Sequence, residues 1–98
     1  MYISSNIKLL RKRTNYSQIE MAHALELTRS VLNSYENNVA NPPVEVVMRI
    51  ADYFRISLDT LVRVDLTRLP ESKIFMLVKG LEASIRTQHL SFLNPIQP

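Results

Sequence analysis

Residues 17–36 read SQIEMAHALELTRSVLNSYE, and this stretch decides the fold. Its apolar residues recur at helical spacing on both sides of a short break, which predicts two short helices that each bury one stripe. Thr28 stands where the second helix should begin, because a threonine hydroxyl can accept from the first backbone N–H groups of a helix. The predicted stripes are Ile19, Met21, Ala22 and Leu25 in the first helix, and Val31, Leu32 and Tyr35 in the second.

A second capping signal supports this division. Ser17 followed by Glu20 predicts a capping box, in which each side chain bonds the backbone N–H group of the other residue. Two short helices joined by a tight turn, roughly at right angles, form the helix-turn-helix motif that places its second helix in a DNA groove.

The stretch and its surroundings resemble the phage-repressor (Cro/repressor, xenobiotic-response-element type) helix-turn-helix family of transcriptional regulators. The resemblance runs in register over roughly residues 4–62. It implies an all-α fold, with five helices around one core and residues 1–64 as the DNA-binding domain. The family often has glycine where this chain has Glu26, Asn38 and Arg55, so left-handed non-glycine residues are expected there. The matching residues are Ser17, Gln18, Ala22, Leu25, Thr28 to Ser30, Tyr35, Glu36, Asn41, Pro42, Val44, Ile50, Ala51 and Ile56 to Leu61.

The other helices follow from similar signals. Ser4 or Ser5 can cap a first helix that runs to about Arg13. Pro43 suits the first position of a fourth helix, and Ser57 can cap a fifth. Their predicted buried residues are Ile3, Ile7 and Leu10 in the first helix, Val44, Val47, Met48, Ile50, Ala51 and Phe54 in the fourth, and Leu58, Leu61 and Val62 in the fifth.

Residues 65–98 form a C-terminal extension outside the resemblance. Pro70 can open a helix, although residues 74–78 are also compatible with a strand that ends before Gly80. An apolar helical stripe must be covered, and we predict that a second copy of the chain covers it. Folding back on its own domain, or binding another partner, are the alternatives. The predicted dimerisation residues are Ile74, Phe75, Leu77, Val78, Leu81 and Ile85.

The second helix of the motif offers polar residues on one face for base contacts. Arginine is the commonest specific reader of guanine, and serine can donate or accept. The resemblance also implies phosphate contacts from the first helix, the motif's opening and the following loop, and an ion pair between Arg11 and Glu36. The predicted base contacts are Thr28, Arg29, Ser30, Asn33 and Ser34. The predicted phosphate contacts are Arg11, Arg13, Ser17, Gln18, Asn37, Asn38 and Asn41.

The composition gives little support to catalysis. The 98-residue chain has no cysteine, and His23 and His89 form neither a metal site nor a triad, so we expect no enzyme activity, metal or cofactor. No apolar run approaches the roughly 20 residues of a membrane span, and the start lacks a signal-peptide core. The net charge is +3, with basic residues gathered before the motif, which suits a cytoplasmic nucleic-acid-binding protein.

The sequence therefore predicts a regulator, most simply a repressor, that binds a palindromic operator in double-stranded DNA as a homodimer. The first alternative is an antitoxin or adaptor that binds a protein partner through residues 65–98. The second is that the chain is the DNA-reading part of a longer regulator.

Overall fold

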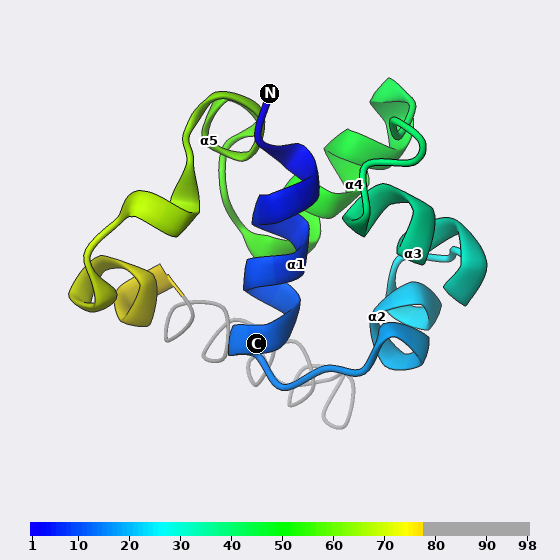
Figure 1. Cartoon of the computed structure of the whole chain (residues 1–98), viewed down its shortest axis with the longest axis horizontal. Helices are drawn as coiled ribbons and strands as arrows, with labels where there is room; N and C mark the ends of the chain where they lie inside the picture. Colours follow the sequence, from blue (N-terminus) through cyan, green and yellow to red (C-terminus); the bar gives the residue numbers. More distant parts are fainter. Residues whose placement is uncertain (78–98) are drawn as a thin grey trace, which may run out of the picture.

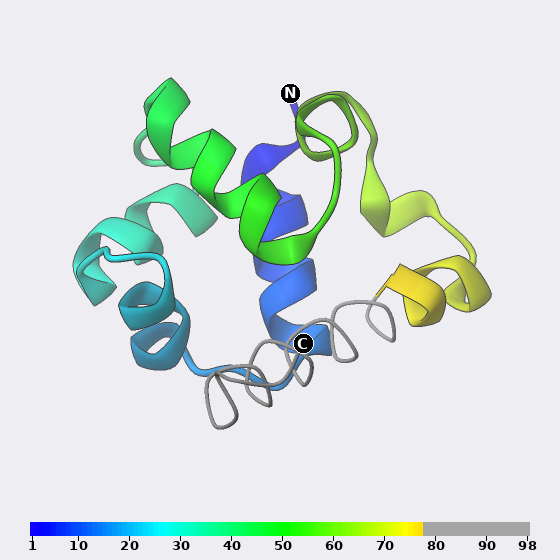
Figure 2. The ribbon, with the colours of Figure 1, turned by 180° about the vertical axis from the view of Figure 1, so that it is seen from behind.

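The computed structural model describes residues 1–77, and all regular structure within them is helical. The elements are α1 (Ile3–Arg13), α2 (Gln18–Ala24), α3 (Arg29–Glu36), α4 (Val44–Phe54), α5 (Leu58–Arg63), the 3₁₀ helix η1 (Leu66–Arg68) and a helical stretch at 71–77. Figure 1 shows α1 in the middle, α2 and α3 to one side, and η1 with residues 71–77 to the other. The view from behind in Figure 2 brings α4 to the front. The predicted all-α, five-helix architecture is confirmed. Residues 74–77 are helical, so the alternative of a strand at 74–78 is wrong over its described part.

The first helix begins earlier than its serines suggested. Tyr2 is the N-cap of α1 and makes no side-chain cap bond, so the predicted cap at Ser4 or Ser5 is wrong. The Tyr2 backbone N–H instead donates to the Val62 carbonyl at 3.1 Å, which ties the start of the chain to α5. This long-range bond lets Ile3 enter the helix and the core, where it is buried.

The motif buries a narrower stripe than its periodicity predicted. Met21 and Ala22 of α2 and its C-cap Leu25 are buried, as are Leu32 and Tyr35 of α3. The prediction was wrong for two residues, because Ile19 is 64% exposed and Val31 is 37% exposed. Each lies on the side of a short helix that no other element covers.

The stripe of α4 is also displaced from its prediction. Pro43 is the N-cap of α4 rather than its first residue, and Val46 is buried in place of Val44. Val44, Met48 and Leu58 are exposed, so their predicted burial is wrong. The buried residues of α4 are Val46, Val47, Ile50, Ala51 and Phe54. They form two neighbouring rows along the helix, and within each row the residues are spaced four apart. The next row, which contains Val44 and Met48, faces solvent.

A residue in the left-handed conformation follows each of α2, α3 and α4, at the three positions where the family often has glycine and where we expected it. Glu26, Asn38 and Arg55 have φ angles of 59°, 58° and 58°. The sequence did not indicate Asn15, which has a φ of 61°. At the turn after α2, the Arg49 guanidinium donates to the Leu25 carbonyl at 2.8 Å and so satisfies a group that the helix end leaves free.

Replacing Glu26 with glycine should leave the free energy of unfolding unchanged or raise it by up to about 1 kcal/mol. The left-handed conformation costs a non-glycine residue about 1–2 kcal/mol, while glycine's greater freedom in the unfolded chain takes back about 0.5–1. Thermal unfolding of the two proteins measures the difference. A clear loss of stability would mean that the Glu26 side chain makes a needed contact.

The core extends beyond residue 64, where we predicted the DNA-binding domain to end. Leu66 is fully buried, and Leu69 and Leu77 pack against the same core. Ile74, predicted to contact a second chain, is only 3% exposed within its own chain. The predicted dimerisation residues Val78, Leu81 and Ile85 lie outside the described residues.

One side chain holds α1 to the chain that follows α5. Asn6 is fully buried, although it is polar. Its amide nitrogen donates to the Leu61 and Val64 carbonyls at 2.8 and 2.7 Å, and its oxygen accepts from the Leu66 N–H at 3.0 Å. Asn6 therefore satisfies three backbone groups that no regular element pairs there.

Candidate nucleic-acid interface

The two motif helices are capped as the sequence predicted. The Ser17 hydroxyl accepts from the Glu20 N–H at 3.1 Å, and the Glu20 carboxylate accepts from the Ser17 N–H at 3.0 Å. The bond from the Ser17 N–H lowers the pKa of Glu20, so this carboxylate is ionised at neutral pH. Thr28 caps α3 by accepting from the Val31 N–H at 3.1 Å. These caps fix where α3 starts and which side of it faces solvent.

Three predicted base contacts lie together on the exposed side of α3. Arg29, Ser30 and Asn33 are all exposed, and with Gln18 from α2 they line an open recess of about 490 Å³. A second recess shares Gln18 and Arg29 with the first and continues across the opening of α2. Polar groups from both motif helices therefore converge on one surface.

A buried ion pair lies beneath this surface. Arg11 donates through Nε to Glu36 Oε2 at 2.7 Å and through Nη2 to Oε1 at 2.9 Å. The remaining nitrogen, Nη1, donates to the Tyr16 carbonyl at 3.0 Å. The side chains of Arg11 and Glu36 are only 13% and 1% exposed. The bonds to Glu36 raise the pKa of Arg11, and the ion pair that the resemblance implied is present.

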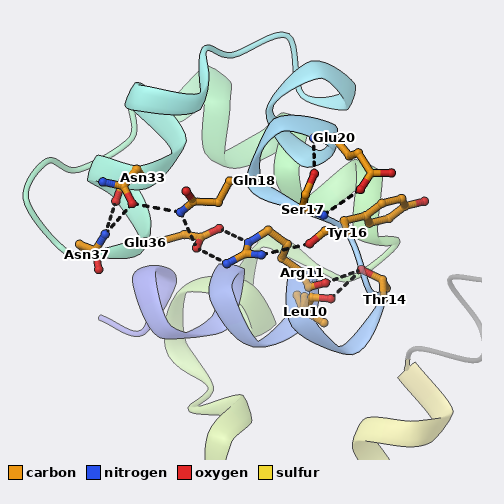
Figure 3. A network of polar contacts seen from close by, with 10 residues as sticks. All are labelled: Leu10, Arg11, Thr14, Tyr16, Ser17, Gln18, Glu20, Asn33, Glu36 and Asn37. Atoms are coloured by element: carbon orange, nitrogen blue, oxygen red, sulfur yellow. Dashed lines mark hydrogen bonds and ion pairs between the residues drawn. The ribbon is translucent and has the colours of Figure 1, made fainter.

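Gln18 connects the ion pair to the exposed face of α3, as Figure 3 shows. Its amide nitrogen donates to Glu36 Oε1 at 3.3 Å and to Asn33 Oδ1 at 3.1 Å. Asn37 Nδ2 also donates to Asn33, both to its Oδ1 and to its backbone carbonyl, at 2.9 Å each. The Asn33 side chain is therefore held from two sides.

The other two predicted base contacts use their side chains within the protein. The Thr28 hydroxyl is engaged in the cap described above. Ser34 is half-buried, and its hydroxyl donates to the Ser30 carbonyl at 3.1 Å. Neither residue lines the recess formed by Gln18, Arg29, Ser30 and Asn33.

The predicted phosphate contacts are divided between two parts of the molecule. Ser17, Gln18, Asn37 and Asn38 lie around the two motif helices, and Asn41 is exposed in the loop that follows. Arg13 is engaged elsewhere, because both of its terminal nitrogens donate to the Glu71 carboxylate at 2.6 Å. The segment that carries Glu71 lies across α1 from α3 (Figure 1).

Two residues near this surface were missed as site candidates. Lys8 lines a recess with Asn37 and Asn38, so it adds a positive charge where we predicted only amides. Ile19, assigned to the core from its spacing, lines the recess that contains Ser17 and Arg29. The clustering of basic residues in the first helix was the available signal for Lys8. No local signal separated Ile19 from its buried neighbours.

Residues 1–77 present neither a cluster of metal-ligating side chains nor a helix that could span a membrane. No group of three or more histidine, aspartate or glutamate side chains within residues 1–77 could hold a metal ion. Among the helices described, none combines the length and the apolar character needed to cross a membrane.

Comparisons with known proteins agree with this geometry. A helix-turn-helix family model matches residues 7–61, which is more than half of the chain. The HTH-type transcriptional regulator RamB, from two strains of Mycobacterium tuberculosis, is 34% identical over 68 residues. That match covers 69% of this chain but only 14% of RamB. A chain of the SinR protein/SinI protein complex superposes with a TM-score of 0.61 at 24% identity, over 94% of this chain and 91% of that one, which shows a shared fold.

Proposed function

Because this chain belongs to the phage-repressor type of helix-turn-helix family, whose members are DNA-binding transcriptional regulators, we propose that it represses transcription by reading an operator with α3. The surface formed by Arg29, Ser30 and Asn33 enters the major groove and contacts base edges. Gln18 and the amides after α3 contact phosphates and set the position of α3 on the duplex.

One observation carries the proposal: exposed hydrogen-bonding side chains of α3 converge with Gln18 over a buried ion pair. Arg11 and Glu36 fix α1 to the end of α3, so the surface is held rigidly before DNA arrives. A rigid surface loses little conformational entropy on binding, which favours specific contacts.

Selection of binding sites from random duplex DNA by the full chain tests this function. We expect an enriched sequence with two-fold symmetry, with half-sites about one helical turn apart. Binding should weaken steeply as salt rises, because phosphate contacts release counterions. The absence of any enriched sequence, or an affinity that is independent of salt, would refute the proposal.

Replacing Arg29 with alanine should cost about 1–3 kcal/mol per half-site and relax the preference at one base pair. Arg29 is exposed at the first turn of α3, so its loss should leave the fold intact. Competition assays against operators altered at each position measure both effects. Equal weakening on every sequence would instead assign Arg29 to the phosphate backbone.

We further propose that the chain acts as a dimer. One small module buries only about 600–1,000 Å² on DNA, and pairing two of them on a symmetric site strengthens binding. Phe75 and Met76 support an interface on residues 65–98, because they are 64% and 71% exposed on the helical stretch at 71–77.

Replacing Phe75 and Met76 together with glutamine should convert dimers to monomers in sedimentation and weaken operator binding at least about tenfold. Both side chains are exposed, so the fold of residues 1–69 should remain. Leu58→Gln is the matched control, because Leu58 lies in a different apolar recess with Met1 and Val44. Monomers produced by Leu58→Gln alone would move the interface to that recess.

A second function rests on the same two exposed residues. An antitoxin or adaptor would use Phe75 and Met76 to bind a different protein, with DNA binding retained or lost. The chain spans only 14% of the length of RamB, so nothing of that protein's whole activity is carried over. A full chain that stays monomeric yet still binds its selected DNA would favour this role.

A further inference from the structure

The buried ion pair fixes the direction of a chain of hydrogen bonds that ends at the exposed face of α3. The Glu36 carboxylate can only accept, and the Arg11 guanidinium can only donate. Gln18 approaches Glu36 Oε1 at 3.3 Å, so the amide of Gln18 must present its nitrogen there. The same nitrogen lies 3.1 Å from Asn33 Oδ1, and the Asn33 side chain must present its oxygen to it.

Asn37 fixes the same orientation independently. Its Nδ2 lies 2.9 Å from the Asn33 backbone carbonyl, which can only accept, so the amide of Asn37 cannot be reversed. This nitrogen also donates to Asn33 Oδ1 at 2.9 Å. Both lone pairs of that oxygen are therefore used, and the amide nitrogen of Asn33 is left to point away from Gln18 (Figure 3).

We propose that Asn33 acts toward DNA only as a hydrogen-bond donor, and therefore contacts an acceptor on a base edge (a keto oxygen or a purine N7) or a phosphate oxygen. This inference rests on the proposed function. Asparagine ordinarily reads adenine by donating to N7 while accepting from the N6 amino group. In this chain the accepting oxygen is already occupied. Guanine, which offers the two acceptors O6 and N7, and thymine, which offers O4, fit the remaining nitrogen.

Gln18 and Glu36 are positioning residues in this proposal, since they act through Asn33. The Asn33 side chain is exposed, which suits a group that meets DNA. Glu36 is 1% exposed and cannot reach a base itself. The buried charge and Asn37 together thus determine which chemical group the recess between α2 and α3 presents.

The test uses the full chain and its selected operator, with Asn33→Ala to identify the contacted position. At the operator position where Asn33→Ala loses base preference, the base is replaced by analogues that each lack one hydrogen-bonding group. Taking away an acceptor, as 7-deazaguanine does at N7, should weaken binding of the unchanged protein about tenfold and leave Asn33→Ala unaffected. Taking away an exocyclic amino group, as purine does in place of adenine, should change the operator affinity of neither the unchanged protein nor Asn33→Ala. A loss specific to the unchanged protein in that second case overturns the inference.

A contact between Asn33 and a phosphate oxygen, in place of a base, gives a different result. Asn33→Ala would then weaken all sequences equally, and one neutral methylphosphonate linkage would remove the difference between the two proteins. Asn33→Asp, which keeps the shape but has no donor, should bind no better than Asn33→Ala in either case.

Two further variants separate positioning from simple loss of stability. Gln18→Ala combined with Asn37→Ala removes both donors to Asn33 Oδ1 and frees the Asn33 amide to reverse, so dependence on an exocyclic amino group should appear without loss of helical content. His23→Ala, which alters an exposed residue of α2 outside the network, should leave the affinity for each unmodified and modified operator unchanged. Selection that enriches no sequence overturns the proposed function and this inference together, whereas an enriched operator read through an amino group by the unchanged protein overturns the inference alone.

Discussion

Replacing Asn6 with alanine is expected to lower the free energy of unfolding by about 3–5 kcal/mol. The change leaves the Leu61 and Val64 carbonyls and the Leu66 N–H without their partner in the interior. Each buried polar group left unpaired costs about 1–3 kcal/mol. For a small domain that is stable by only about 5–15 kcal/mol, such a loss should lower the melting temperature by roughly 15–30 °C.

Lys12→Ala is the control for this prediction. Lys12 is exposed on the same helix, so the substitution introduces alanine with only a small change in helix propensity and without opening the interior. Calorimetry of the three proteins measures the loss. An Asn6→Ala protein as stable as the control would mean that water or a backbone shift replaces the amide. Hydrogen exchange should then show the Leu66 N–H still protected.

Replacing Arg11 with alanine is expected to cost about 3–5 kcal/mol, because it leaves the Glu36 carboxylate buried without its cation. Glu36→Ala should cost less, about 2–3 kcal/mol, since Arg11 is 13% exposed and its charge can turn toward water. Denaturant unfolding of each protein gives these values.

The double variant separates the ion pair from the packing of its members. If the pair is the cause, Arg11→Ala with Glu36→Ala should be at least about 2 kcal/mol more stable than the sum of the single losses predicts. Strict additivity would contradict a coupled pair. A large loss of DNA affinity in Arg11→Ala at unchanged stability would instead assign Arg11 to phosphate.

The starts of α2, α3 and α5 were predictable because each cap is a contact between residues close in sequence. Ser17 with Glu20 and Thr28 with Val31 span three residues each, and Ser57 likewise accepts from the Thr60 N–H at 3.0 Å. Such bonds form wherever the chain turns into a helix, whatever packs around it. The order of the helices and the position of α3 on the chain therefore followed from the sequence alone.

The face that each helix buries was only partly predictable. Periodicity shows that an apolar stripe exists, but its edges depend on which neighbour covers them. Ile19 and Val44 fit helical spacing as well as the residues beside them, yet each is more than half exposed. Val46, left out of the predicted stripe, is buried instead. Helical spacing alone allows several apolar residues of each helix to be buried, and the packing of neighbouring elements decides which of them are.

The sequence by itself determined the fold class, the caps of α2, α3 and α5, and the residues that α3 can offer to DNA. The tertiary structure decided which polar groups become partners across the chain. Asn6 meets groups 55–60 residues away, and Arg13 is drawn to Glu71 and away from α3. The Asn33 amide is held from a second side in the same way, because Gln18 of α2 adds to the local bond from Asn37. A side-chain amide can present either its nitrogen as a donor or its oxygen as an acceptor. Which of the two faces a partner is decided only when the fold brings that partner into contact.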